Sequence, residues 1–224
     1  MNKPLPFVLL TALACGAHSG HTDAEVIIAT QDSYIRNNGG GVTAANSNFG
    51  SDDDLWLKPG ANGFFRMIYL DFDVSSVTLA SVVSAELDLD VIDVTGGTTM
   101  TYSVYGITDS WDENTITWNN APYNNGDATP FGTDLGSATM VFADTPDNLT
   151  FSSTELLNFV KSSSGTVSLI LHPTDMDGNV NLNFHSTEGP NGNTNAPTLT
   201  LTVPEPGSFA LLLAGGLLIS RRRR

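Results

Sequence analysis

Hydrophobic and polar residues alternate along much of the chain, a pattern typical of strands with one face in a core and the other in water. In 81–91 the apolar face is formed by Val83, Ala85, Leu87, Leu89 and Val91, with acidic and hydroxyl side chains between them. In 64–74 the prediction places Ile68, Leu70, Phe72 and Val74 inward, and Met67, Tyr69, Asp71 and Asp73 outward. Further strands are predicted at 25–29, 54–58, 100–107, 138–142, 165–172, 181–184 and 198–203.

One segment has the pattern of a short helix of roughly two turns that ends by Gly165. Ser153 or Thr154 can cap its first turn, and Glu155 lies near its positive end. Its apolar face is formed by Leu156, Leu157, Phe159 and Val160. The connectors are rich in Gly, Asn, Asp and Pro, which favour turns. Many short strands with one short helix predict an all-β domain, a jelly-roll-type sandwich of two sheets.

The first residues of the chain have the composition of an export signal. A basic start at Lys3 precedes an apolar run over 5–14, which is shorter than the roughly 20 residues of a membrane span. Small residues follow, so the sequence predicts a signal peptide over 1–23. One alternative is a buried N-terminal helix, which Gly16 would interrupt. The other is a lipoprotein signal with a lipidated Cys15, although the preferred Leu three residues earlier is absent.

The last residues, 204–224, have the order of a sorting signal. It is formed by Val203, Pro204, Glu205 and Pro206, an apolar segment over 208–220, and terminal arginines that begin with Arg221 and Arg222. An apolar helix before a basic cluster stops transfer through the membrane. This helix would be about 20 Å long, which suits transient rather than permanent anchoring in the inner membrane.

This order closely resembles the PEP-CTERM sorting signal. The resemblance implies processing near Pro204-Glu205-Pro206 by an exosortase, in Gram-negative bacteria that make exopolysaccharide. An ordinary tail anchor is the alternative, but it does not account for a signal peptide at the other end.

The central segment, 24–203, is long enough for one domain with a sizeable core. The only cysteine of the chain, Cys15, lies outside it, so it contains no disulfide. The chain has a formal net charge of −15, and the central segment has only four basic residues, Arg36, Lys58, Arg66 and Lys161. Such an acidic surface repels nucleic acid and anionic membranes, so neither is predicted as a stable partner.

Several short motifs follow one another along the central segment. They are Asp32-Ser33-Tyr34-Ile35-Arg36, Asn48-Phe49-Gly50, the segment 66–73, Ser84-Ala85-Glu86-Leu87, the segment 111–122 with Trp111 and Trp118, Phe184-His185-Ser186-Thr187-Glu188, and Pro197-Thr198-Leu199. In this order they resemble the DNRLRE domain, which is related to an alginate-binding carbohydrate-binding module. The resemblance implies a β-sandwich of secreted enzymes and surface proteins, often with glycan binding. Alginate binders rely on basic side chains, whereas this segment has only four.

The chain lacks the motifs of common hydrolases. It contains no Gly-x-Ser-x-Gly and no His-Glu-x-x-His. His172 and His185 are predicted to be polar residues that face solvent. Acid pairs along strands overlap the spacing of glycosidase carboxylates, but in so acidic a chain they are predicted to be solvated faces. No catalytic residue is predicted.

Structural calcium is the one candidate cofactor. Asp175, Asp177 and Asn179 place oxygen ligands at alternate positions around Gly178, as hard cations prefer. No Glu follows at the EF-hand distance. The run 52–54 is a weaker candidate, which is better explained as a solvated turn.

Aromatic rings stack on sugar faces, and polar or charged groups beside them fix the hydroxyls. Trp56, Arg66 and Tyr69 are the predicted glycan-binding residues, although a regular strand would place Arg66 and Tyr69 on opposite faces. Trp111 and Trp118 are predicted to belong to the core.

These features predict a secreted or cell-surface protein of the extracellular matrix or biofilm, with no catalytic activity. Its predicted partners are extracellular polysaccharide and an exosortase, with only transient membrane contact. The first alternative is a structural matrix or adhesion protein that binds no glycan. The second is a small secreted glycan hydrolase or lyase, which would need a convergent acid/base pair in a cleft.

Overall fold

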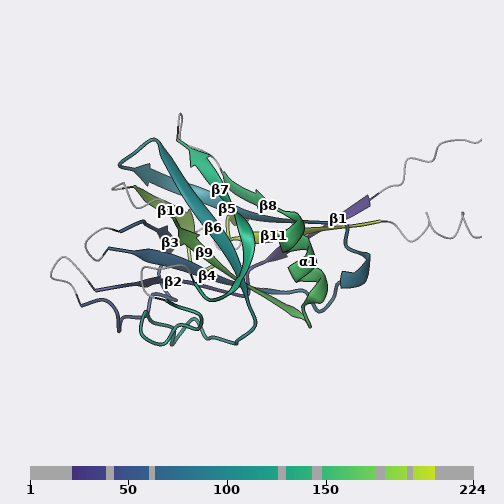
Figure 1. Ribbon diagram of the computed structural model, residues 1–224, viewed down its shortest axis with the longest axis horizontal. Coiled ribbons are helices and arrows are strands. Elements are labelled where there is room, and N and C mark those ends of the chain that lie inside the picture. The colour runs from purple at the N-terminus through teal and green to yellow at the C-terminus, as the bar shows by residue number, and fades with distance from the viewer. Residues whose placement is uncertain are drawn as a thin grey trace, which may run out of the picture. The chain divides into compact units, whose positions relative to one another are not determined.

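The computed structural model describes residues 22–38, 43–60, 64–125, 130–142, 148–174, 180–190 and 194–204 (Figure 1). Residues 22–204 form one compact unit, which begins two residues before the predicted start at 24. The predicted signal peptide up to residue 21 and the sorting-signal residues Glu205, Pro206, Arg221 and Arg222 lie outside the described residues. Val203 and Pro204 lie in the last strand.

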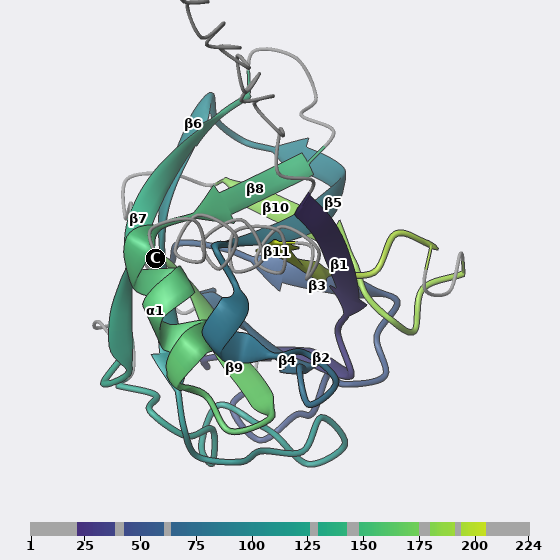
Figure 2. The same cartoon turned by 90° about the vertical axis from the view of Figure 1, so that its right-hand side faces the viewer.

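Two antiparallel sheets form the domain (Figures 1 and 2). The first has the order β1-β11-β5-β10-β3, with β8 also paired to β5, and the second has the order β2-β4-β9-β6-β7. The strands are β1 (Thr22–Ile28), β2 (Gln31–Arg36), β3 (Asp54–Leu57), β4 (Arg66–Asp73), β5 (Ser84–Thr95), β6 (Thr99–Ile107), β7 (Thr133–Val141), β8 (Asn148–Ser152), β9 (Thr166–Pro173), β10 (Asn181–His185) and β11 (Thr198–Pro204). The helices are α1 (Thr154–Ser162) and the short 3-10 turn η1 (Leu79–Ser81).

The main core lies between the two sheets, as the alternation predicts, except that Val83, predicted on the apolar face, precedes β5 and is exposed. Along β5, Ala85, Leu87, Leu89 and Val91 are buried in this core, whereas the residues between them are exposed or half-buried. The inward residues predicted for β4, namely Ile68, Leu70, Phe72 and Val74, belong to the same core. The prediction of a two-sheet β-sandwich with one short helix is confirmed. The strands β2 and β8 are additions that the alternation does not reveal.

Helix α1 forms where the sequence predicts it. The hydroxyl of Ser153 accepts a hydrogen bond from the Leu156 N–H at 2.9 Å and donates one to the Leu135 carbonyl at 2.7 Å. The first bond caps the helix, and the second attaches it to β7. On its inner side, the ring of Phe159 packs so closely on Gly106 that a Cβ there would lie 2.5 Å from it. Gly106 is therefore required for this packing.

The predicted outward face of β4 is buried, which corrects the sequence analysis. Met67 and Tyr69 are fully buried and Asp71 is nearly so, and only Asp73 is exposed. The long connection 108–125 lies over this face and forms a second core. Its buried members are Ile35, Phe65, Met67, Tyr69, Tyr105, Ile107, Trp111, Ile116 and Ile170. Alternation predicts which residues share a face, but not what another part of the chain places over it.

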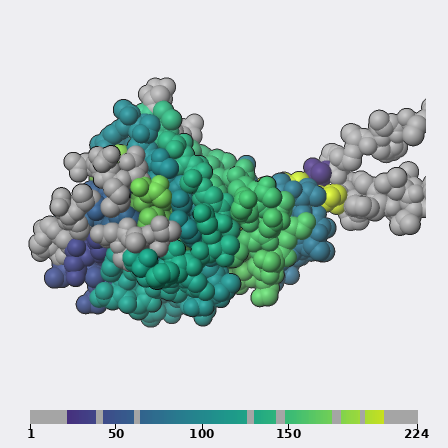
Figure 3. All heavy atoms as spheres, viewed as in Figure 1, coloured from purple at the N-terminus to yellow at the C-terminus, as the bar shows by residue number. Residues whose placement is uncertain are grey.

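Two side-chain hydrogen bonds attach this connection to β4. The indole N–H of Trp111 donates to Oδ1 of Asp71 at 2.8 Å, and the Tyr69 hydroxyl donates to the Pro122 carbonyl at 2.9 Å. Trp111 is buried, as predicted, and Trp118 is half-buried with its ring edge-on to Phe65. Figure 3 shows the teal connection as part of the surface along the lower edge of the view.

His172 is also buried, which contradicts its predicted exposure. Its ring lies 5.1 Å from that of Phe65 and 6.1 Å from that of Tyr105, measured between centroids. His185 is half-buried at the end of β10. The histidine prediction fails at position 172 because this residue too lies beneath the covered face of the second sheet. No helix within the described ranges is long and apolar enough to cross a membrane.

Trp111→Phe tests the anchor of the connection. We expect a loss of about 1–3 kcal/mol in the free energy of unfolding, because the buried carboxylate of Asp71 loses a donor. Urea unfolding measures this change. Trp118→Phe is the matched control, because its indole makes no such bond to a described residue, and its loss is expected to be smaller. Equal losses in the two variants would contradict the role assigned to the hydrogen bond.

Candidate functional site

Three basic side chains lie in a row across neighbouring strands. Arg36 of β2 pairs with Arg66 of β4, and Arg66 pairs in turn with Lys58 through an antiparallel bridge. The bridge is held by two backbone hydrogen bonds of 3.3 and 3.0 Å between Lys58 and Arg66. Residues paired in this way carry their side chains on the same face, with Cβ atoms roughly 4.5–5.5 Å apart. Of the basic residues of the central segment, only Lys161 lies elsewhere, where it donates to the Val82 carbonyl.

Two aromatic rings lie beneath these cations. The guanidinium carbon of Arg36 and the ammonium of Lys58 are each 5.2 Å from the centroid of the Phe64 ring. The guanidinium carbon of Arg66 is 4.8 Å from the centroid of the Trp56 ring. At these distances the electron-rich faces of the rings attract the cations. The five side chains, all half-buried, are called the basic–aromatic patch below.

The bridge between Lys58 and Arg66 positions the patch where β3 of one sheet approaches the start of β4 of the other. At Gly60 a Cβ would lie 2.5 Å from the backbone nitrogen of Phe65, so this close approach leaves no room for a side chain. Beyond the end of β2, the Asn37 side-chain oxygen accepts from the Phe65 N–H at 3.0 Å. These contacts fix Lys58 and Arg36 on either side of the β4 start.

No carboxylate of the described residues compensates the positive charge of the patch. Burial and repulsion from Arg66 and Arg36 lower the pKa of Lys58. Burial and repulsion from Arg36 lower the pKa of Arg66. Within the described ranges, no carboxylate forms an ion pair with these residues, and the Nε atoms of Arg36 and Arg66 are buried without a hydrogen-bond partner. Like charges held side by side are unfavourable, so an anion at this point would stabilise the fold.

The structure unites two of the three predicted glycan-binding residues. Trp56 and Arg66 are in direct contact, whereas Tyr69 lies on the opposite face of β4 and is fully buried in the second core. The alternation along β4 predicts this separation. Arg36, Lys58 and Phe64 were missed as site residues. Alternation places Lys58 on the face of Trp56 and Phe64 on the face of Arg66, but only the pairing of β2 with β4 and the bridge from Lys58 to Arg66 bring the three cations together.

The predicted metal ligands Asp175, Asp177 and Asn179 lie outside the described residues. Within the described part of the chain, no three His, Cys, Asp or Glu side chains already converge as a metal site.

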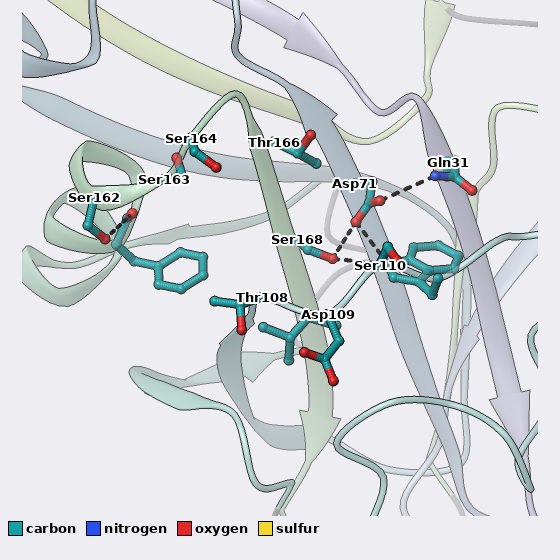
Figure 4. A pocket seen from close by; sticks show the side chains of 13 residues that line it. Gln31, Asp71, Thr108, Asp109, Ser110, Ser162, Ser163, Ser164, Thr166 and Ser168 are labelled. Carbon is teal, nitrogen blue, oxygen red and sulfur yellow. Dashed lines mark hydrogen bonds between the residues drawn. The ribbon is translucent and has the colours of Figure 1, made fainter.

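A hollow of about 460 Å³ opens on another part of the surface (Figure 4). Hydroxyl-bearing residues from the end of α1 and from β9 line it, together with Gln31, Asp71 and Trp111. The carboxylate of Asp71 accepts from Trp111, from Ser168 and, at 3.3 Å, from Gln31. Burial raises the pKa of Asp71, and the bonds from Ser168 and Trp111 oppose that shift. These bonds already engage both carboxylate oxygens, so the contacts of this hollow serve to anchor the connection 108–125.

A two-sheet sandwich with cations and aromatic rings on one part of its surface is the architecture of a carbohydrate-binding module. The family model of carbohydrate-binding module family 96 matches residues 24–203. The chain therefore belongs to this family, which indicates carbohydrate binding and a non-catalytic role. No curated protein matches the chain.

The pKa of Lys58 tests the geometry of the patch. Because the folded-state pKa is lowered, the unfolded chain binds more protons between the folded and unfolded pKa values, and stability rises with pH through that window. We expect Arg66→Met to raise this pKa towards its ordinary value, since a repelling neighbour is removed. Arg36→Met should raise it less, because its repulsion is the weaker one. NMR titration of the Lys58 side chain measures both shifts, and an unchanged pKa in Arg66→Met would contradict the arrangement.

Proposed function

We propose that the basic–aromatic patch binds an anionic extracellular polysaccharide. The observation that carries the proposal is the gathering of Arg36, Lys58 and Arg66 over two rings, without carboxylate partners among the described residues, in a chain of net charge −15. Acidic groups of the polymer would supply the missing counter-charges. Guanidinium groups suit carboxylates because they can donate two parallel hydrogen bonds.

The aromatic rings give the patch a second means of recognition. Trp56 and Phe64 are half-buried, so part of each side chain is open to a ligand. Sugar rings pack on aromatic faces through their apolar C–H groups, and this contact requires no particular charge. The proposed ligand is therefore a polymer with repeated acidic sugars, in which the acidic groups meet the cations and the sugar rings meet the aromatic residues.

The acidity of the remaining surface supports a second candidate function. A structural matrix or adhesion protein without glycan binding needs a soluble, strongly charged coat, and most charged side chains of this chain are acidic. The patch would then be a contact for an acidic protein surface. A glycan-binding measurement separates this candidate from the first.

We further propose that the protein is exported and then sorted by an exosortase. The basic start with an apolar run over 5–14 supports export, and Pro204-Glu205-Pro206 followed by an apolar segment and terminal arginines supports sorting. Delivery to the cell surface or the extracellular matrix would bring the module to secreted polysaccharide, after transient anchoring in the inner membrane.

Affinity electrophoresis of the full chain against polyuronate and neutral polysaccharides tests glycan binding. We expect retardation by the polyuronate, and Arg66→Ala should weaken it about tenfold or more, since a charge-assisted hydrogen bond contributes about 1.5–3 kcal/mol. Trp56→Ala should also weaken it, because the aromatic face that packs on the sugar rings is lost. Lys161→Ala is the matched control, because this residue lies outside the patch and should bind as the unmodified chain does. No retardation by any polysaccharide would exclude the first candidate and leave the structural one.

Production in an exosortase-bearing Gram-negative host tests sorting. We expect mass spectrometry of the extracellular protein to show removal of the segment after Pro204-Glu205-Pro206. Replacement of these three residues by alanine should leave an unprocessed, membrane-associated chain. Ser208→Ala, in the adjoining apolar segment, is the control and should be processed. Full-length protein outside the cells would contradict the proposal.

A further inference from the structure

Asp32 of β2 is a buried carboxylate, and among the described residues only one of its two oxygens has a hydrogen-bond partner. Its side chain is 0% exposed. Oδ2 accepts a hydrogen bond from the Thr187 N–H at 2.9 Å, whereas Oδ1 is buried without a partner among the described residues. A buried polar atom left without a partner is unfavourable by about 1–3 kcal/mol, and by more when it is charged. A group that binds Oδ1 would therefore stabilise this position.

Two further carboxylates lie beside Asp32. Glu113 is half-buried, and its Oε2 accepts from the Asp32 backbone N–H at 3.2 Å. Glu188 is exposed, and its Oε1 accepts from the Thr187 hydroxyl at 2.8 Å. Burial, and then repulsion from Glu188 and Glu113, raise the pKa of Asp32 to about 7, against the effect of backbone and side-chain hydrogen bonding from Thr187. Burial and repulsion from Glu188 and Asp112 also raise the pKa of Glu113. No basic side chain of the described chain offsets this negative charge.

The surrounding backbone holds these groups in place. The amide of Asn48 donates to the carbonyls of Glu113 and Ile116. A Cβ at Gly50 would lie 2.0 Å from the Glu113 carbonyl oxygen, so the turn packs directly on the connection. On the other side, the Ser186 hydroxyl donates to the Asp52 carbonyl at 2.7 Å. Four segments distant in sequence therefore meet around Asp32.

A proton alone does not satisfy this arrangement. Protonation of Asp32 would remove its own charge, but it would supply no positive group beside Glu113 and Glu188. A cation would compensate the negative charge of these carboxylates and would also coordinate Oδ1 of Asp32. Calcium suits the available atoms, since it takes six to eight oxygen ligands, including carboxylates, backbone carbonyls and water, in flexible geometry.

We propose that Asp32, Glu113 and Glu188 form a calcium site that joins β2 to the connection 108–125 and to the segment that follows β10. Because the three carboxylates do not converge as they stand, the exposed Glu188 side chain turns towards Asp32 when the ion binds. Water and backbone carbonyls complete the coordination. This site is separate from Asp175, Asp177 and Asn179, and it does not depend on glycan binding at the basic–aromatic patch.

Calorimetric titration of the chelator-treated full chain with calcium chloride tests this site. We expect one calcium ion to bind, with Glu188→Gln and Glu113→Gln each weakening the affinity at least about tenfold, by comparison with the 10–100-fold effects of changes around metal ligands. Glu86→Gln is the matched control, because Glu86 is exposed on β5 and should leave the affinity unchanged. Asp175→Asn combined with Asp177→Asn should also leave it unchanged.

Thermal unfolding is a second measurement, and it can also be made on a variant that no longer binds calcium. Calcium should raise the melting temperature of the unmodified chain, because a ligand that binds only the folded state stabilises it. In Asp32→Asn calcium should no longer raise the melting temperature. This should hold even if the variant and the unmodified chain have the same melting temperature in chelator. No calcium binding, or binding lost only in the Asp175 and Asp177 double variant, would overturn the proposal.

Discussion

Asp71 lies in the middle of β4, and its carboxylate accepts the indole N–H of Trp111 at 2.8 Å. This contact attaches the connection 108–125 to the sheet and closes the second core over Tyr69. A strand that is buried on both faces cannot shift its register by one residue, because every side chain would move to the wrong environment. The register of β4 in turn places Arg66 opposite Arg36. The covered face of the sheet therefore fixes the arrangement of the basic–aromatic patch at its end.

The same carboxylate reaches the proposed calcium site through Gln31. The Gln31 side chain donates to Oδ2 of Asp71 at 3.3 Å and accepts the Glu113 N–H at 3.2 Å. Glu113 then accepts the N–H of Asp32. Polar contacts thus run from the centre of β4 to the edge strand β2, and they position a carboxylate from the connection beside one from the sheet. A cation there would hold the connection at Glu113, close to the point at which Trp111 is bound to Asp71.

The predictability of the fold differs between the two faces of the second sheet. Alternation predicts the inner residues of β4 because the sandwich core imposes a period of two, and Ser153 predicts α1 because capping depends on nearby residues. Alternation does not predict the burial of Met67, Tyr69 and His172, because the residues that cover them come from a separate part of the chain. The site shows the same limit. Trp56 and Arg66 could be chosen by residue type, whereas Arg36 joins them only through the pairing of β2 with β4, which a single sequence does not specify.

The contrast between the patch and the remaining surface has a consequence for specificity. A net charge of −15 repels an acidic polymer from most of the molecule, and at physiological ionic strength this repulsion extends about 8 Å from exposed charges. Among the described residues, Arg36, Lys58 and Arg66 are the only basic side chains that lie together. Specificity is a difference between affinities, so it depends on weak binding in other orientations as well as on favourable contacts in the correct one. Because the acidic coat disfavours other orientations, it would direct such a polymer onto the patch. Three cations could then suffice for specific binding, whereas a protein with a neutral surface would need more.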